Sequence, residues 1–342
     1  MSNNGKLTAL RKTLLSKNAF ILYALAAGYA VLAALVYTGS ASRQLSGMIT
    51  TVSCYIVLGV SLNLVVGLLG ELSLGHAGFM SVGLYAGCLF SIATADVLPL
   101  LPRMLLSMLL GGLAAAAVGL VVGLPALRLK GDYLAIVTLA CGEIIKNAIT
   151  NFKFTGGALG LNTGSIYEKT KALFPYAVLI VFVTILVVMN MKRSRHGRAI
   201  MAIRDNRIAA ESCGINATYY KLLAFVVAAF FAGVAGVLYG HTLANVNPST
   251  FDYNMSIEIL VIVVLGGMGN IGGSVLAAIV LQVLPEALRD FADLRMLIYS
   301  VLLIAIMLLN ASPRFKEFKG RWSLRTLFLA ARKGNDGKEA QK

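Results

Sequence analysis

The sequence predicts an all-α protein, a polytopic bundle of transmembrane helices, and three observations lead to this fold class. Of the 342 residues, 58% are hydrophobic and only 13% are charged, whereas soluble globular domains carry about 25% charged residues. Apolar runs long enough to cross a membrane recur along the whole chain. Lys and Arg gather in alternate connections between these runs, as they do in membrane proteins of fixed orientation.

Each candidate span is a run of about 20 mainly apolar residues, the length that crosses the hydrocarbon core as a helix. The runs, in order, are 19–38, 47–67, 76–95, 103–124, 133–150, 173–190, 222–241, 256–268, 271–287 and 294–310. The pair 256–268 and 271–287 is short, so it forms either two tilted spans or two half-spans. The prediction is therefore 8–10 spans, and either number leaves both termini on one side.

The distribution of basic residues predicts the orientation. With the N-terminus in the cytoplasm, the inner segments 1–18, 125–132, 191–221 and 311–342 hold most of the 30 Lys and Arg residues. Residues 1–18 then form a cytoplasmic basic N-terminus, 19–310 a membrane domain, and 311–342 a cytoplasmic basic tail with a disordered end. The net charge of +15 is a topology signal, with attraction to the anionic lipid bilayer as a secondary effect. We expect no nucleic-acid partner.

Motifs for catalysis are missing. Neither Gly5-Lys6 nor Gly337-Lys338 belongs to a P-loop, so we do not expect this chain to bind ATP through one. The three histidines are scattered, and the four cysteines have no CxxC spacing, so we expect neither a metal site nor disulfides. The chain is not expected to be an enzyme: we predict no catalytic residue and no cofactor of its own.

Two glycine-rich clusters interrupt the apolar pattern, LLGELSLGHAG (68–78) and LGGMGNIGG (265–273). Irregular backbone at membrane depth survives only where protein buries it or a wet cavity adjoins it. Paired interruptions in the two halves of a chain point to transport sites and to a weak internal repeat. Ordinary tight turns between helices are the alternative interpretation.

Polar groups within apolar runs are candidates for a translocation pathway. They are Asn63, Glu71, His76, Thr138 and Glu143. Structural roles compete with this interpretation. Glu143 is placed to pair with Lys146 at i, i+3, and Glu71 and His76 are placed to satisfy the broken backbone of 68–78.

A short charged segment, GRAIMAIRDNRIAAESCGIN (197–216), lies between two apolar runs. On a helix over 198–213, small apolar residues share one side and Arg204, Arg207 and Glu211 share the other. Gly214 suits the end of this helix, Asn216 suits the cap of the next, and Asp205–Asn206 is a point where the segment divides into two. The small apolar side fits close docking into a groove of another protein. Contact with lipid headgroups is the alternative, but surface helices there usually carry bulky apolar residues.

Four blocks resemble the permeases of ABC importers of the branched-chain amino acid (LIV) type, and most closely the larger of their two paired permeases. The blocks are SLNLVVGLLGELSLGHAGFMSVGLYAG (61–87), KGDYLAIVTLACGEII (130–145), GRAIMAIRDNRIAAESCGINATYYKLLAFVVAAFFAGVAGVLYG (197–240) and VVLGGMGNIGG (263–273). The resemblance covers about 47–310. It implies the helical bundle shared with vitamin B12 and ribose importers, with the loop 191–221 as the coupling loop.

The resemblance also implies partners: a sister permease, two cytoplasmic ATPase subunits that use ATP and Mg, and an extracytoplasmic binding protein in a bacterial inner membrane. The residues implied to couple the chain to the ATPases are Arg198, Ile200, Ile203, Arg204, Asp205, Arg207, Ala209, Glu211 and Gly214. The expected substrates are leucine, isoleucine and valine. Urea, amides or other small organic solutes are alternatives, as are an ion-driven secondary transporter and a membrane scaffold.

Overall fold

The computed structural model describes residues 17–38, 43–129 and 131–288, together with residues 300, 301, 304 and 308. Contacts divide the chain into two units, Met1–Val283 and Leu284–Lys342, and the boundary lies within the helix Ile271–Ala287. Most of the predicted segment 1–18, most of the predicted span 294–310 and the whole tail 311–342 lie outside the described residues.

The described part is mainly helical, which confirms the predicted fold class. Its long helices are α2 (Lys17–Thr38), α3 (Arg43–Asn63), α4 (His76–Ala93), α5 (Leu100–Ala126), α6 (Asp132–Asn151), α7 (Thr170–Arg193), α10 (Ala217–Gly240), α11 (Tyr253–Gly266) and α12 (Ile271–Ala287). Seven helical segments within the described residues are long and apolar enough to cross a membrane, and Leu25–Thr38 and α12 are apolar but shorter. The choice between eight and ten spans remains a prediction.

Helices α4, α5 and α10 pack against one another through small residues. A Cβ added at Gly83 of α4 would overlap the main chain of Gly233 in α10, and one at Gly111 of α5 would meet the main chain of Gly83. Small side chains at these positions let backbones approach closely, where lipid offers no hydrophobic drive for association. The small residues at these positions of α4, α5 and α10 thus form the packing surfaces between the helices.

Helix α3 lies among α7, α10 and α11 and is almost wholly buried beyond its first turn. It continues into a π-helix, η1 (Leu64–Leu69), which ends at Gly70 with a left-handed φ of 76°. Residues 70–75 are non-helical, and α4 begins only at His76. At the second predicted interruption, α11 ends at Gly266 and a tight turn containing Gly267 and Gly269 leads into α12. Both interruptions are therefore present.

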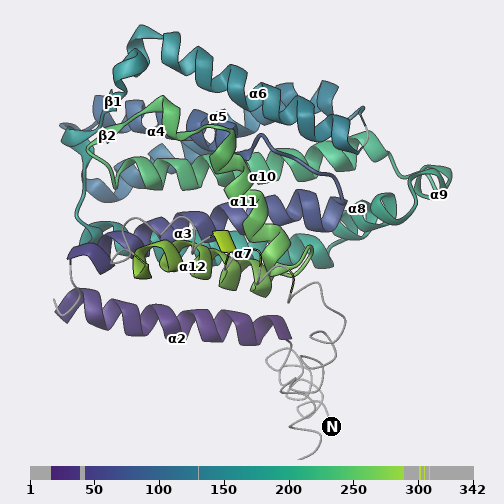
Figure 1. Ribbon diagram of the computed structural model, residues 1–342, viewed down its shortest axis with the longest axis horizontal. Coiled ribbons are helices and arrows are strands. Elements are labelled where there is room, and N and C mark those ends of the chain that lie inside the picture. The colour runs from purple at the N-terminus through teal and green to yellow at the C-terminus, as the bar shows by residue number, and fades with distance from the viewer. Residues whose placement is uncertain are drawn as a thin grey trace, which may run out of the picture. The chain divides into compact units, whose positions relative to one another are not determined.

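The two ends of the long helices carry different structures (Figure 1). At one end, β1 (Leu161–Asn162) pairs antiparallel with β2 (Asn245–Val246), and short 3-10 turns η2 (Lys153–Thr155), η3 (Gly157–Leu159), η4 (Gly164–Ile166) and η5 (Pro248–Thr250) complete the loops. An ion pair between Arg103 and Glu168, 3.2 Å long, ties α5 to these loops. At the other end, α8 (Arg195–Asp205) and α9 (Arg207–Ser212) project beyond the bundle.

Candidate functional site

The charged segment of the sequence forms α8 and α9, and local capping explains how it folds. The Ser194 side chain accepts a hydrogen bond from Gly197 N at 3.2 Å, which starts α8. Asn206 breaks the helix and then caps α9 by accepting from Ala209 N at 3.1 Å. Gly214, with φ of 80°, ends α9, and Asn216 caps α10. The predicted division at Asp205–Asn206 and both predicted end signals are confirmed.

The small apolar side of α8–α9 faces this chain in part. Ile200 is 0% exposed and Ile203 is 4% exposed. Ile203, Ala210 and Ala217 form a cluster, against which Ile215 and other partly buried residues pack. The first turn of α10 and the end of the bundle cover this part, so it is not open for docking into another protein. Ala209 and Cys213, which share the predicted side, remain exposed, and docking there stays a prediction.

The outward side of α8–α9 carries charge and one bulky apolar group. Arg204 pairs with Asp205 at 2.9 Å, and Arg207 pairs with Glu211 at 2.9 Å. Arg198, Ala209 and Gly214 are exposed as well. Ile208, 78% exposed, lies among these groups. Ile208 was not among the residues predicted from the sequence, although its spacing of three residues before Glu211 within α9 places an apolar side chain on the charged face.

Arg204 also reaches the bundle. Its Nη1 donates to the carbonyl oxygen of Gly67 in η1 at 3.2 Å, and its aliphatic part lies across Gly70. From the end of α7, the Lys192 Nζ donates to the carbonyl oxygen of Gly269 at 2.7 Å. The segment and the end of α7 thus contact both glycine-rich interruptions.

Asn63 joins these two interruptions inside the bundle. Its Oδ1 accepts from Gly269 N at 2.7 Å, and its Nδ2 donates to the Ser274 Oγ of α12 at 2.7 Å. A Cβ added at Gly67 would overlap the main chain of Gly269, so the two glycines are in direct backbone contact. The pairing of the clusters, which the sequence indicated only by composition, is a physical contact.

Three of the other pathway candidates are partnered within the chain. His76 Nε2 and Ser61 Oγ are 2.8 Å apart, with His76 only 2% exposed. The Thr138 hydroxyl accepts from Leu74 N at 3.0 Å and so satisfies the broken backbone before α4. Glu71 pairs with Lys221 at the start of α10. These contacts favour the structural interpretation for this conformation.

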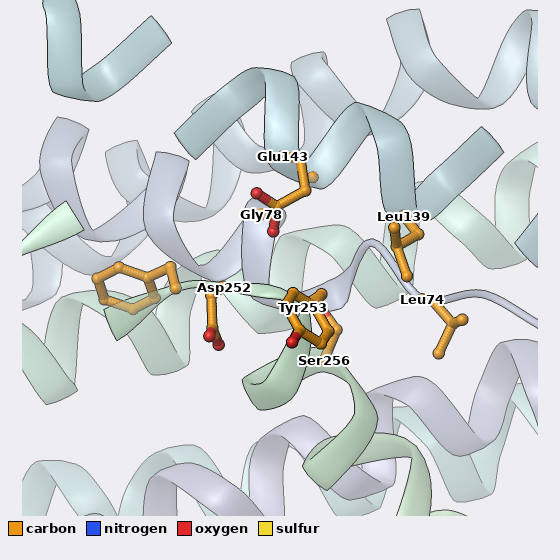
Figure 2. A pocket seen from close by; sticks show the side chains of 9 residues that line it. Leu74, Gly78, Leu139, Glu143, Asp252, Tyr253 and Ser256 are labelled. Carbon is orange, nitrogen blue, oxygen red and sulfur yellow. The ribbon is translucent and has the colours of Figure 1, made fainter. Parts of the chain in front are cut away.

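Glu143 also has a partner, Lys146 at i, i+3, but its side chain is more exposed than theirs, at 28%. It lines a hollow between α6 and the start of α11, which Figure 2 shows from close by. Across the hollow lie Asp252, which caps α11, and Tyr253. Of the pathway residues predicted from the sequence, Glu143 is the one that lines this hollow.

The outward faces of α5 and α6 differ in chemistry. Every exposed side chain of α5 is apolar, and most are leucines. By contrast, α6 exposes Tyr133, Ile136, Ile144, Asn147 and Asn151 and leaves Glu143 and Lys146 half-buried. Charged side chains facing lipid at mid-depth cost about 2.5–3.5 kcal/mol by insertion scales. The α5 face therefore suits lipid, and the α6 face suits protein or water.

Within the described residues, no group of His, Cys, Asp and Glu side chains is arranged to hold a metal ion. The arrangement is instead that of a membrane bundle whose projecting segment is tied to two broken helices, with one polar face.

Residues 44–310 match the family described as the permease component of branched-chain amino acid transport systems. Over 302 residues, the chain is 36% identical to the high-affinity branched-chain amino acid transport system permease protein LivM of Escherichia coli, covering 78% of this chain and 69% of that protein. BraD of Pseudomonas aeruginosa, a permease protein of the same kind of system, is 27% identical over 70% of this chain and 84% of its own length. LivH of Salmonella typhimurium is 23% identical over 72% of this chain and 85% of its own length.

No solved structure gives a significant match to the chain. The family match covers most of the sequence and includes the α8–α9 segment and both interruptions. The chain therefore belongs to the family of permease components of branched-chain amino acid transport systems.

Proposed function

We propose that this chain is one of two different permease subunits of an ATP-driven importer, and that it translocates leucine, isoleucine and valine. The relatives named for this transport include both LivM and LivH, which supports a sister permease beside this chain. Two ATPase subunits then hydrolyse ATP with Mg on the cytoplasmic side, and an extracytoplasmic binding protein delivers the substrate. The assembly lies in the inner membrane with both termini of this chain in the cytoplasm.

One observation supports this proposal above the others, namely the exposed charged side of α8–α9. Ile208 is apolar and 78% exposed in α9, and the four ionic side chains of the pairs Arg204–Asp205 and Arg207–Glu211 lie within four residues of it in sequence. An apolar centre within a charged rim is the usual composition of a protein interface. The ATPase is the partner that this position fits, because the sequence places the segment among the basic, cytoplasmic connections.

The translocation pathway is proposed along the α6 face beside the start of α11. Glu143, Asp252 and Tyr253 supply polar groups there, and the face is unsuited to lipid. The sister permease covers the rest of this face.

Ile208→Glu tests the contact with the ATPase. The added charge would be buried against a partner, so we expect the variant to insert normally but to lose most co-purifying ATPase and most uptake of labelled leucine. The matched control is Val97→Glu, an equally exposed apolar position in the loop between α4 and α5, at the opposite end of α4 from the Gly70 junction. Unchanged ATPase binding by Ile208→Glu would refute the proposed interface.

The substrate is tested by the same uptake assay with leucine, isoleucine, valine and urea as competitors, and by calorimetry on the cognate binding protein. Competition by urea alone would replace the proposed substrate class. Gradient-driven uptake by this chain reconstituted without ATPases would replace the ATP-driven mechanism.

A further inference from the structure

The two helices joined directly to α8–α9, α7 and α10, do not form either interruption. Covalently, the segment continues only from α7 and into α10. The junctions at Gly67–Gly70 and Gly267–Gly269 belong to α3, α4, α11 and α12, which are distant in sequence. Any movement of the segment reaches them through non-covalent contacts.

Two cationic side chains, one at the end of α7 and one in α8, donate hydrogen bonds to main-chain carbonyl oxygens of the two interruptions. Lys192 Nζ holds Gly269 O at 2.7 Å, and Arg204 Nη1 holds Gly67 O at 3.2 Å. Carbonyl groups at interrupted helices are the acceptors that lack a helical donor. Within the described residues, no carboxylate pairs with Lys192, so its interaction with the turn is not competing with an ion pair.

The two carbonyl groups belong to one block. Asn63 bonds both Gly269 N and Ser274 Oγ, and Gly67 lies against the main chain of Gly269. A displacement applied at either carbonyl is therefore passed to α3 and α12 together, because close-packed interiors transmit strain rather than absorb it.

We propose that Lys192, at the end of α7, and Arg204, in α8, are positioning residues that fasten the α7–α8 connection and the α8–α9 segment to this block, so that the segment and the α11–α12 turn move as one body during transport. The inference rests on the proposed function, because it concerns how a movement of the ATPase subunits is transmitted to the transmembrane helices. Packing of Ile200 and Ile203 holds the segment on the bundle, and the two cations fix its register against the turn.

The first test uses the complete importer, reconstituted in vesicles with its ATPases, sister permease and binding protein. In Lys192→Met, at a side chain that bonds to Gly269 O and lies outside the proposed ATPase interface, we expect the complex to assemble and to hydrolyse ATP, while substrate moved per ATP falls at least about tenfold. Lys192→Arg keeps the donor and is expected to restore most of the ratio. A merely stabilising role would lower the yield of complex without changing the ratio. An unchanged ratio in the assembled Lys192→Met complex overturns the inference.

A second test keeps both cations and so does not depend on the folding of that variant. Cys213 is native and exposed on α9, and Met268 in the turn is 66% exposed. Spin labels at Cys213 and at Met268→Cys, with Cys141→Ser, are expected to keep one separation in the nucleotide-free and ATP-bound complexes. A label pair at Cys213 and Val97→Cys serves as the reference that changes.

A nucleotide-dependent change in the first pair as large as that in the second overturns the inference and leaves the proposed function intact. Both the inference and the proposed function are overturned if the complete wild-type complex shows no ATP-driven uptake and neither labelled complex shows a nucleotide-dependent distance.

Discussion

At the scale of single residues, the polar side chains inside the apolar runs are mostly structural. Asn63 is 0% exposed and bonds with both of its amide atoms, and His76 and Thr138 are buried and hydrogen-bonded within the chain. Buried polar groups with complete partners specify one arrangement of the helices around them. Glu143 is the exception, with an accessible carboxylate beside a hollow.

Asn63→Ala should show how much the junction of the two interruptions depends on this amide. The substitution leaves the half-buried Gly269 N without its acceptor, and a fully buried donor left in this way costs about 1–3 kcal/mol. We expect thermal unfolding of the purified complex to shift to a lower temperature. Asn162→Ala is the control, since Asn162 is exposed and bonds only locally, to Gly164 N. Equal unfolding temperatures for the two variants would mean that the junction is held by glycine packing alone.

At the scale of helices, exposure separates two kinds of membrane face. On α5, the outward side is apolar throughout and mostly leucine, while α6 combines isoleucine with asparagine, glutamate and lysine. Both helices pass the same tests of length and hydropathy as spans. The two helices differ in the side chains that remain exposed after packing. The exposed side chains determine which helix is suited to contact with lipid.

Cysteine substitutions at matched positions should distinguish the faces. Ile144 of α6 is 66% exposed and Leu113 of α5 is 52% exposed. In the complete complex carrying Cys141→Ser, we expect Ile144→Cys to cross-link to the sister permease and Leu113→Cys to react only with a lipid-phase reagent. Both substitutions should leave assembly unchanged. Cross-linking from Leu113→Cys instead of Ile144→Cys would reverse the proposed arrangement of the two permeases.

At the scale of the whole molecule, the two ends of the bundle differ in their connections. The end with α8 and α9 carries the basic residues of 191–221, and the end with β1 and β2 carries the loops tied by Arg103 and Glu168. The positive-inside rule predicts that the α8–α9 end faces the cytoplasm.

Cys213 provides a direct check, because it is exposed on α9, while Cys54 and Cys88 are buried. An impermeant thiol reagent should label Cys213 in inside-out vesicles of cells that express this chain alone, and should not label it in intact cells. Cys213→Ser identifies the signal by its loss. Labelling of Cys213 from outside intact cells would place the segment on the wrong side for an ATPase and would remove the basis of the proposed function.

Local patterns in the sequence were sufficient for the fold class and for the form of the α8–α9 segment. Apolar runs predict helices that span a membrane, and Asn206, Gly214 and Asn216 act on neighbouring backbone groups, so their effects are readable without the fold. The two glycine-rich interruptions were visible for the same reason, since glycine and broken periodicity are local signals.

Tertiary structure alone decided what these parts touch. Part of the small apolar side of α8–α9 is covered by its own bundle, and Arg204, predicted on the outward charged side, also bonds to Gly67, 137 positions away. Asn63 contacts Gly269 and Ser274 across an even longer stretch of chain. A hydrophobic or charged pattern predicts whether a face will be buried or solvated. It does not predict which partner buries the face, because the same small-residue side can pack against helices of this chain or of another protein.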